Sequence, residues 1–229
     1  MKKIVVVSLA LMFSIISNAQ EKIEEGVITM KQTMSSDNEQ MNAQLKQMGD
    51  MTSTGYFKGD KSRSETKSPM TGDMTIIIDG SEKQMLMLMD QPGMGKVYMK
   101  ESISPSEEDL KSVKVTKGSE TKTVLGYECQ QYMIEMVQNG QPVEMEMFVT
   151  DKISAISQNT TAMGDKIEGY PLYFVMRMNQ MGANMEVTSE VTKIEKQSVA
   201  DSKFSMTPPE GFTEMGVPKN PMLNEENKN

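Results

Sequence analysis

Alternation of apolar and polar residues with a period of two dominates the chain and predicts β-strands. Residues 26–34 show the pattern clearly, with Ile28, Met30 and Met34 on one face. Similar runs, separated by Gly, Asn, Asp or Pro, predict further strands at residues 52–57, 62–66, 74–79, 84–89, 96–100, 113–117, 120–124, 127–137, 143–150, 172–178 and 183–196. The pairs Asp79-Gly80 and Asn139-Gly140 are typical of hairpin turns. The pattern therefore predicts a mainly β protein with a few helices, built on a single curved antiparallel sheet.

Two capping patterns predict short helices between these strands. Ser36-Asp37-Asn38-Glu39 has the S-x-x-E form of a capping box, and Met41, Leu45 and Met48 follow at helical spacing up to Gly49. Ser104 offers a second cap with Pro105 at the first helical position, which predicts a helix to Ser112. Residues 151–169 are polar and irregular, and we expect them to be partly helical.

The N-terminus has the form of a signal for export. Lys2 and Lys3 precede an apolar run over residues 4–16, which is shorter than the ~20 residues that cross a bilayer. Small residues then end at Ala19, which predicts cleavage between Ala19 and Gln20. We expect a periplasmic or secreted protein without a transmembrane segment, organised as a signal peptide (1–19), one domain (20–216) and a disordered tail (217–229).

Composition excludes several classes of function. The chain has no His, no Trp and one Cys, which argues against a Ser-His-Asp hydrolase, a zinc enzyme and a disulfide scaffold. Without Lys2 and Lys3 it carries 22 basic and 32 acidic side chains, a net charge of −10 that disfavours nucleic acid as a partner. Cys129 lies in an apolar strand pattern, so we expect a buried side chain rather than an intermolecular disulfide.

Catalytic motifs are equally scarce. Ser64-Glu65-Thr66-Lys67 and Ser119-Glu120-Thr121-Lys122 match the S-x-x-K motif of penicillin-recognising enzymes, but K-T-G is absent and both matches fall in predicted strands. The acidic run Glu107-Glu108-Asp109 falls in the first turn of a predicted helix, where carboxylates are common. We therefore expect no enzymatic activity, no cofactor and no metal bound by the usual ligands.

Methionine is the main chemical signal, with 26 residues in the chain. Alternation places Met145 and Met147 on one strand face, and Met176 and Met178 likewise, while residues 85–89 are apolar on both faces. A flexible thioether surface adapts to ligands of varied shape. This pattern predicts a ligand-binding cavity lined by Met85, Met87, Met89, Met145, Met147, Met176 and Met178.

Other interpretations of the methionines stay open. They could fill the core in place of scarce Leu and Phe, since Met tolerates irregular gaps. Thioethers also select Cu(I), and methionines two residues apart on a strand lie ~7 Å apart, which predicts a copper-binding protein if sulfurs of neighbouring strands converge. Reversible oxidation would make the protein an oxidant buffer. An envelope structural or interaction module would instead expose a large apolar patch.

Several short blocks resemble a known family. Residues 56–63 (YFKGDKSR) are similar to the first hairpin of an uncharacterised family of exported Gram-negative proteins, known only as a domain of unknown function. Later blocks of that family resemble, in the same order, residues 76–79, 125–129, 169–172 and 204–212, so that the resemblance covers residues 26–215.

That family is grouped with the LolA-like lipoprotein carriers. The resemblance implies an incomplete β-barrel whose concave apolar face is closed by a helical lid and receives acyl chains. Its implied partners are a lipid, an acyl chain or a lipoprotein, although no residue for lipoprotein handover can be placed on this chain. The function expected from sequence is therefore a non-enzymatic exported protein that binds a lipid or other hydrophobic ligand in a methionine-rich concave cavity.

Overall fold

A computed structural model describes residues 21–215 of the chain, except residues 69, 94, 139 and 181. The predicted signal peptide, its cleavage point and the predicted tail at 217–229 lie outside the described residues. Among the described residues, no helix combines the length and the apolar character that crossing a membrane requires.

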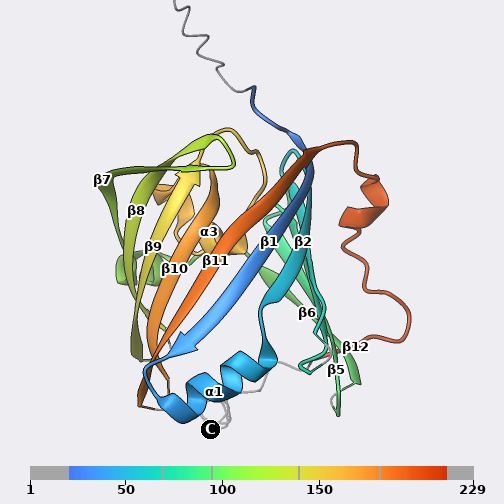
Figure 1. Ribbon diagram of the computed structural model, residues 1–229. Coiled ribbons are helices and arrows are strands. Elements are labelled where there is room, and N and C mark those ends of the chain that lie inside the picture. The colour runs from blue at the N-terminus through green and yellow to red at the C-terminus, as the bar shows by residue number, and fades with distance from the viewer. Residues whose placement is uncertain (1–20, 69, 94, 139, 181, 216–229) are drawn as a thin grey trace, which may run out of the picture.

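The described strands form one open, curved sheet, which confirms the mainly β fold (Figure 1). Its twelve described strands are β1 (Glu25–Ser36), β2 (Met51–Lys58), β3 (Lys61–Thr66), β4 (Asp73–Asp79), β5 (Gln84–Gln91), β6 (Gly95–Ser102), β7 (Lys114–Val124), β8 (Tyr127–Gln138), β9 (Gln141–Thr150), β10 (Tyr170–Gln180), β11 (Ala183–Lys196) and β12 (Thr213–Glu214). They follow the order β12-β6-β5-β4-β3-β2-β1-β11-β10-β9-β8-β7. Neighbours pair antiparallel except β12, a short parallel addition to β6 that the sequence pattern did not predict. The sheet bends around its interior without closing on itself.

Three α-helices are described: α1 (Glu39–Met48), α2 (Glu107–Ser112) and α3 (Gln158–Thr161). The predicted cap of α1 at Ser36 is wrong, because Ser36 is still the last residue of β1. Asn38 caps the helix instead, its side-chain oxygen accepting from the backbone N–H of Met41 at 3.0 Å. α1 links β1 to β2 at one end of the sheet, and its apolar stripe is only half-buried.

The second helix also begins later than predicted. Ser106, not Ser104, is the N-cap of α2, because Ser106 and Asp109 form a reciprocal capping box. The hydroxyl of Ser106 accepts from the Asp109 N–H at 3.1 Å, and the Asp109 carboxylate accepts from the Ser106 N–H at 3.0 Å. Two backbone donors at the start of the helix are thereby satisfied.

One strand, β7, replaces the two strands predicted at residues 113–117 and 120–124. Its pairing with β8 shifts register between Lys117 and Thr121, so that Gly118 and Ser119, the residues between the two predicted strands, lie in a bulge. The side-chain amide of Gln130 donates to the carbonyl oxygens of Gly118 and Glu120 at 2.8 and 3.2 Å. These bonds satisfy backbone groups that the bulge removes from the regular ladder.

Residues 197–215, the C-terminal strap, run along the convex face of the sheet. The strap begins with Val199 and Phe204, which pack against Val27 and Tyr56. Farther along, Met206 and Phe212 contact the buried cluster of Ile77, Leu86 and Leu88, before the strap ends as β12. It therefore gives the convex side of β1 to β6 an apolar cover.

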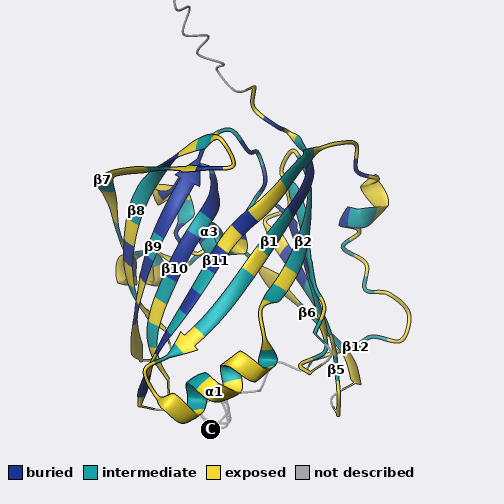
Figure 2. Ribbon diagram, in the orientation of Figure 1, coloured by how far each residue is buried: buried dark blue, intermediate teal, exposed yellow. Residues whose placement is uncertain are grey.

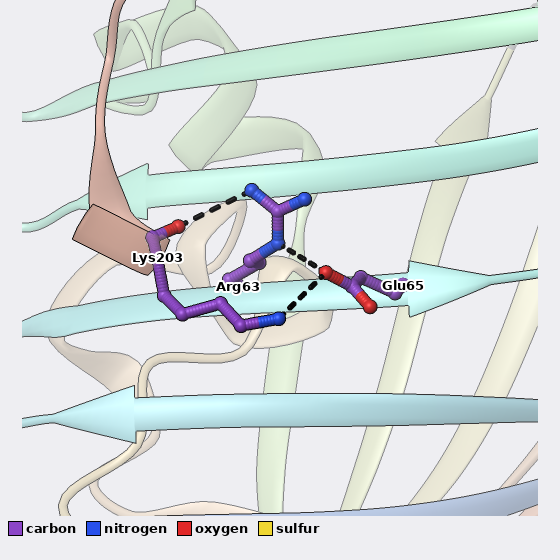
Figure 3. A network of polar contacts seen from close by, with 3 residues as sticks. All are labelled: Arg63, Glu65 and Lys203. Atoms are coloured by element: carbon purple, nitrogen blue, oxygen red, sulfur yellow. Dashed lines mark hydrogen bonds and ion pairs between the residues drawn. The ribbon is translucent and has the colours of Figure 1, made fainter. Parts of the chain in front are cut away.

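A charged network holds the strap to β3 (Figure 3). The Glu65 carboxylate accepts from Arg63 Nε at 2.6 Å and from Lys203 Nζ at 3.4 Å, while Arg63 Nη1 donates to the Lys203 carbonyl oxygen at 3.2 Å. Partial burial acts to raise the pKa of Glu65, but the two cations outweigh it and the net shift is downward. Glu65 is therefore ionised at neutral pH, which maintains both ion pairs.

Burial is most continuous in β9 and β10, at the centre of one half of the sheet (Figure 2). Leu172 of β10 and Cys129 of the nearby β8 are fully buried, and they belong to one cluster with the buried Phe148 and Val191. The prediction that Cys129 is a buried side chain is confirmed, and its thiol is free.

Candidate functional site

Methionine is distributed very unevenly between the two faces of the sheet. Directly opposed residues on neighbouring strands share a face, so the register can be followed from strand to strand. Of the fifteen methionines in described strands, Met133 alone lies on the convex face. The other fourteen share the concave face: Met30, Met34, Met51, Met74, Met85, Met87, Met89, Met99, Met136, Met145, Met147, Met176, Met178 and Met185.

Strand β5 shows that this asymmetry is more than a need for apolar residues. Its Met-Leu-Met-Leu-Met run is apolar on both faces, as predicted. Leu86 and Leu88 pack beneath the strap on the convex face, while Met85, Met87 and Met89 take the concave face. The strand thus carries Leu on one face and thioethers on the other, which makes the two faces chemically different.

Residues 151–169, predicted to be irregular and partly helical, include a lid segment at 153–166 that occupies part of the concavity (Figure 1). The segment contains α3 and a 3₁₀ turn, Gly164–Lys166. Ile153 anchors one end through a bridge to Ile23, and Met163, just before the 3₁₀ turn, packs in a cluster with Met145 and Met147. Lys166 Nζ donates to the carbonyl oxygens of Leu110 and Val113, both at 2.6 Å, and so joins the lid segment to the end of α2.

A cavity of about 570 Å³, here called the lid cavity, remains between the lid segment, α2 and the sheet. Methionines of four strands line it: Met85 of β5, Met136 of β8, Met145 of β9 and Met176 of β10. β5 and β8 are far apart in the strand order, so the curvature of the sheet brings them to one cavity. Further apolar lining comes from Ile103, Pro105, Val113, Val137, Val143 and Ala162.

The rim of the lid cavity is polar and carries one charge among its described residues. Hydroxyl and amide groups are supplied by Ser102, Ser104, Ser112, Gln138, Gln158, Asn159 and Thr161. Asp109 supplies the charge, because the hydroxyl and N–H of Ser106 hold the pKa of its carboxyl below the usual range. An apolar wall with a few polar groups at its mouth is the usual design of a small-molecule site.

The seven methionines predicted to line a cavity share one face but divide among several environments. Met85, Met145 and Met176 line the lid cavity, and Met178 lines a separate open depression beside Met185. Met147 is fully buried beneath the lid segment and is part of the core. Met87 and Met89 are half-buried on the wall formed by β4, β5 and β6.

Sequence reasoning missed Met136, which lies opposite Val143 on the neighbouring strand and lines the lid cavity. Its signal was present, since it shares strand parity with Ile134, a concave-face residue. The lining by α2 and the lid segment carried no comparable signal, because a local pattern does not show where a helix or a loop packs against the sheet.

A second, smaller hollow of about 110 Å³ lies under the other part of the lid segment. Small residues of β2 and β3 form its floor: Ser53, Gly55, Ser62 and Ser64. Gln158 and Asn159 line both hollows, so α3 forms the partition between them. The concave interior is therefore filled in some places and hollow in others.

Conventional metal-binding chemistry is not present in the described part of the chain. No group of three or more His, Cys, Asp or Glu side chains that could hold a metal ion occurs among the described residues. Burial raises the pKa of the Cys129 thiol to about 11, which disfavours the thiolate that a metal or a nucleophilic reaction would need.

Comparison with known proteins identifies a family but no activity. The family model described as "Domain of unknown function (DUF4412)" matches residues 25–212. Comparison with curated proteins found no match. Among solved structures, the chain is similar to PNGF-II in space group C2, with 15% sequence identity, a TM-score of 0.46 and 83% of this chain covered. It is also similar to PNGF-II in space group P21, with 14% sequence identity, a TM-score of 0.49 and 84% of this chain covered. The matched part spans 31% of each PNGF-II chain.

Proposed function

Because the chain belongs to the DUF4412 family, whose description assigns no activity, we propose a function from the site itself. The protein is a non-enzymatic binder of a lipid or another hydrophobic ligand, which it holds in the lid cavity against the methionines of the concave face. The observation that carries this proposal is the convergence of four thioether side chains from four strands on one hollow with a polar mouth.

Size and lining both support this proposal. The lid cavity, at about 570 Å³, falls within the range of about 300–1,000 Å³ that is common for small-molecule sites. Its methionine walls can change rotamer to follow an irregular or flexible ligand. The carboxylate of Asp109 at the rim disfavours an anionic headgroup nearby, so a neutral amphiphile such as a monoacylglycerol suits the site better than a fatty-acid anion.

The proposal includes export and kinship with the LolA-like carriers. An open curved sheet with helices on its concave side is the architecture that the resemblance implies for those carriers. The basic, apolar and small-residue regions of 1–19 support delivery to the periplasm. N-terminal sequencing of the protein recovered from the periplasm of its own host tests this part, and the expected first residue is Gln20.

Binding of a neutral naphthylamine dye, displaced by a monoacylglycerol, tests the ligand site. We expect saturable binding at one site and at least tenfold weaker binding in Met176→Glu, which puts a charge on the cavity wall. Met133→Glu is the matched control, because Met133 lies on the convex face and is already 39% exposed. Binding in that variant should equal the wild type.

A second cavity variant tests the ligand site even if Met176→Glu fails to fold. Ser112 is exposed and lines the cavity, so Ser112→Trp should fill the hollow without inserting a charge into the sheet. Absence of saturable binding to the wild type would overturn the proposal. So would unchanged binding by both cavity variants.

A further inference from the structure

Four methionines outside the lid cavity form a continuous group on neighbouring strands. Met74 of β4 lies directly opposite Met89 of β5, and Met87 of β5 lies directly opposite Met99 of β6. Directly opposed side chains have Cβ atoms ~5 Å apart, and Met87 and Met89 are two residues apart on one strand face. We call Met74, Met87, Met89 and Met99 the thioether patch.

The thioether patch is accessible and differs from the core beside it. All four side chains are half-buried, whereas Ile76, Ile78 and Met85 on the same wall are buried. None of the four lines the lid cavity or the smaller hollow. A ligand at the thioether patch would therefore occupy a place distinct from the proposed lipid site.

The charges around the thioether patch favour a cation. Along β4, β5 and β6, the described positions that share its face carry apolar side chains or glycine, except the neutral Gln91 and the charged Glu101, which is two residues from Met99. The lysines of β6, Lys96 and Lys100, belong to the opposite face. A cation would thus meet thioethers and a nearby carboxylate, without an ammonium group from these three strands on the same face.

We propose that the thioether patch binds one monovalent soft metal ion, Cu(I), through three or four thioether sulfurs. Uncharged, polarizable sulfur is a poor ligand for Ca²⁺ or Mg²⁺ and a good ligand for Cu(I). Met side chains are long and unbranched, so sulfurs on neighbouring strands can turn toward a common point without moving the backbone. Leu at the same positions would pack equally well but supply no ligand, and β5 uses Leu only on its other face.

Silver(I) is the probe of choice, because it shares the soft monovalent character of Cu(I) and stays in one oxidation state. The titration uses the Cys129→Ala variant, so that no thiol competes for the metal, and a chloride-free buffer, so that Ag(I) stays in solution. Native mass spectrometry gives the stoichiometry, and calorimetry gives the affinity. We expect one Ag(I) per chain. The double variant Met87→Leu/Met99→Leu should bind at least tenfold more weakly, because it removes two sulfurs while conserving apolar volume.

The matched control is Met145→Leu/Met176→Leu, which removes two sulfurs from the lid cavity and should leave Ag(I) affinity unchanged. Labelling the methionine methyl groups with ¹³C adds a readout that requires no substitution of Cys129. Shifts at Met74, Met87, Met89 and Met99 upon addition of Ag(I) would support the site. No binding by the parent protein, or equal losses in the two double variants, would overturn it. Dye binding at the lid cavity is measured separately, so failure of either proposal is distinguishable from failure of the other.

Discussion

Lys61 of β3 lies directly opposite Asp79 of β4, and its Nζ is 2.9 Å from Asp79 Oδ2. The other carboxylate oxygen, Oδ1, accepts from the hydroxyl and N–H of Ser81 and from the N–H of Glu82, the two N–H bonds at 3.1 Å. Asp79 is buried, so these bonds replace the water that its carboxylate loses on folding. The β4–β5 turn is therefore organised around one ionised side chain.

Asp79→Asn should destabilise the protein by about 1–3 kcal/mol, since a charged acceptor of several hydrogen bonds is replaced by a neutral amide. The Ser81 hydroxyl, with help from Lys61 and Glu82, lowers the pKa of Asp79 from 3.8 to about 2 despite burial. A lowered pKa gives stabilisation that is complete above 3.8 and is lost as the pH falls toward 2. Denaturant unfolding between pH 7 and pH 2 should show this loss in the wild type and a flatter profile in the variant.

Glu82→Gln is the control for this turn, because Glu82 contributes its backbone N–H rather than its carboxylate. It should keep the wild-type stability and the wild-type pH profile. A variant at Asp79 that retained the acid-dependent loss would contradict the assignment.

Met147 and Met133 give a direct comparison between the two faces. Met147 is fully buried under the lid segment, so Met147→Ala should cost about 2–5 kcal/mol through lost burial and a residual cavity. Met133→Ala, at an exposed position on the convex face, should change the free energy of unfolding by less than about 0.5 kcal/mol. Equal losses in the two variants, measured by denaturant unfolding, would contradict the division of methionines between core and surface.

The sequence predicted strands better than it predicted their ends. Apart from β7 and β12, the predicted strands match the observed ones within two residues at each end, because alternation and turn residues mark them locally. The strap could not be predicted in the same way. The strap contacts β1 to β6 through Val199, Phe204 and Phe212, and its contact residues on those strands lie more than a hundred residues earlier in the chain. The local pattern of apolar and polar residues cannot predict contacts between such distant segments.

The candidate site was predictable as a face and not as a cavity. Alternation correctly placed Met85, Met145 and Met176 on one side of their strands. Which methionines line a hollow depends on how the sheet curves and where Met163 of the lid segment fills it. Both are tertiary properties, and for that reason Met147 is in the core while Met136, unpredicted, lines the lid cavity.

Gly169 should be among the glycines least tolerant of substitution. Its φ is +111°, and a Cβ there would lie 2.4 Å from the Thr150 carbonyl oxygen, where the chain enters β10 against the end of β9. Gly169→Ala should therefore cost about 1–3 kcal/mol in denaturant unfolding. Gly93→Ala is the matched control, because Gly93 has φ +84° with open space around its Cβ direction. Gly93→Ala introduces only backbone strain, so it should lower the free energy of unfolding clearly less than Gly169→Ala does. Equal losses in the two variants would show that the contact with Thr150 relaxes.

Cys129 should be unreactive in the folded protein. Its side chain is fully buried, and burial raises the pKa of the thiol to about 11, so the thiolate is scarce at neutral pH. Labelling with an aromatic disulfide reagent at pH 8 should be slow in buffer and complete within minutes in denaturant. Fast labelling of the native protein would show that β8 opens readily around this residue.

A final prediction concerns the strap, which is attached to the sheet both by a buried aromatic side chain and by an ion pair. Phe204 is buried among Val27, Val199 and Tyr56, and the neighbouring Lys203 binds Glu65. Phe204→Ala removes the anchor, so trypsin should cleave after Lys203 at least tenfold faster than in the wild type. Glu65→Gln should give a smaller increase, since a partly exposed ion pair stabilises by less than burial of an aromatic ring. Glu210→Ala, at an exposed strap position, should leave the cleavage rate unchanged. Equal rates in Phe204→Ala and Glu210→Ala would mean that β12 pairing with β6, rather than Phe204, holds the strap in place.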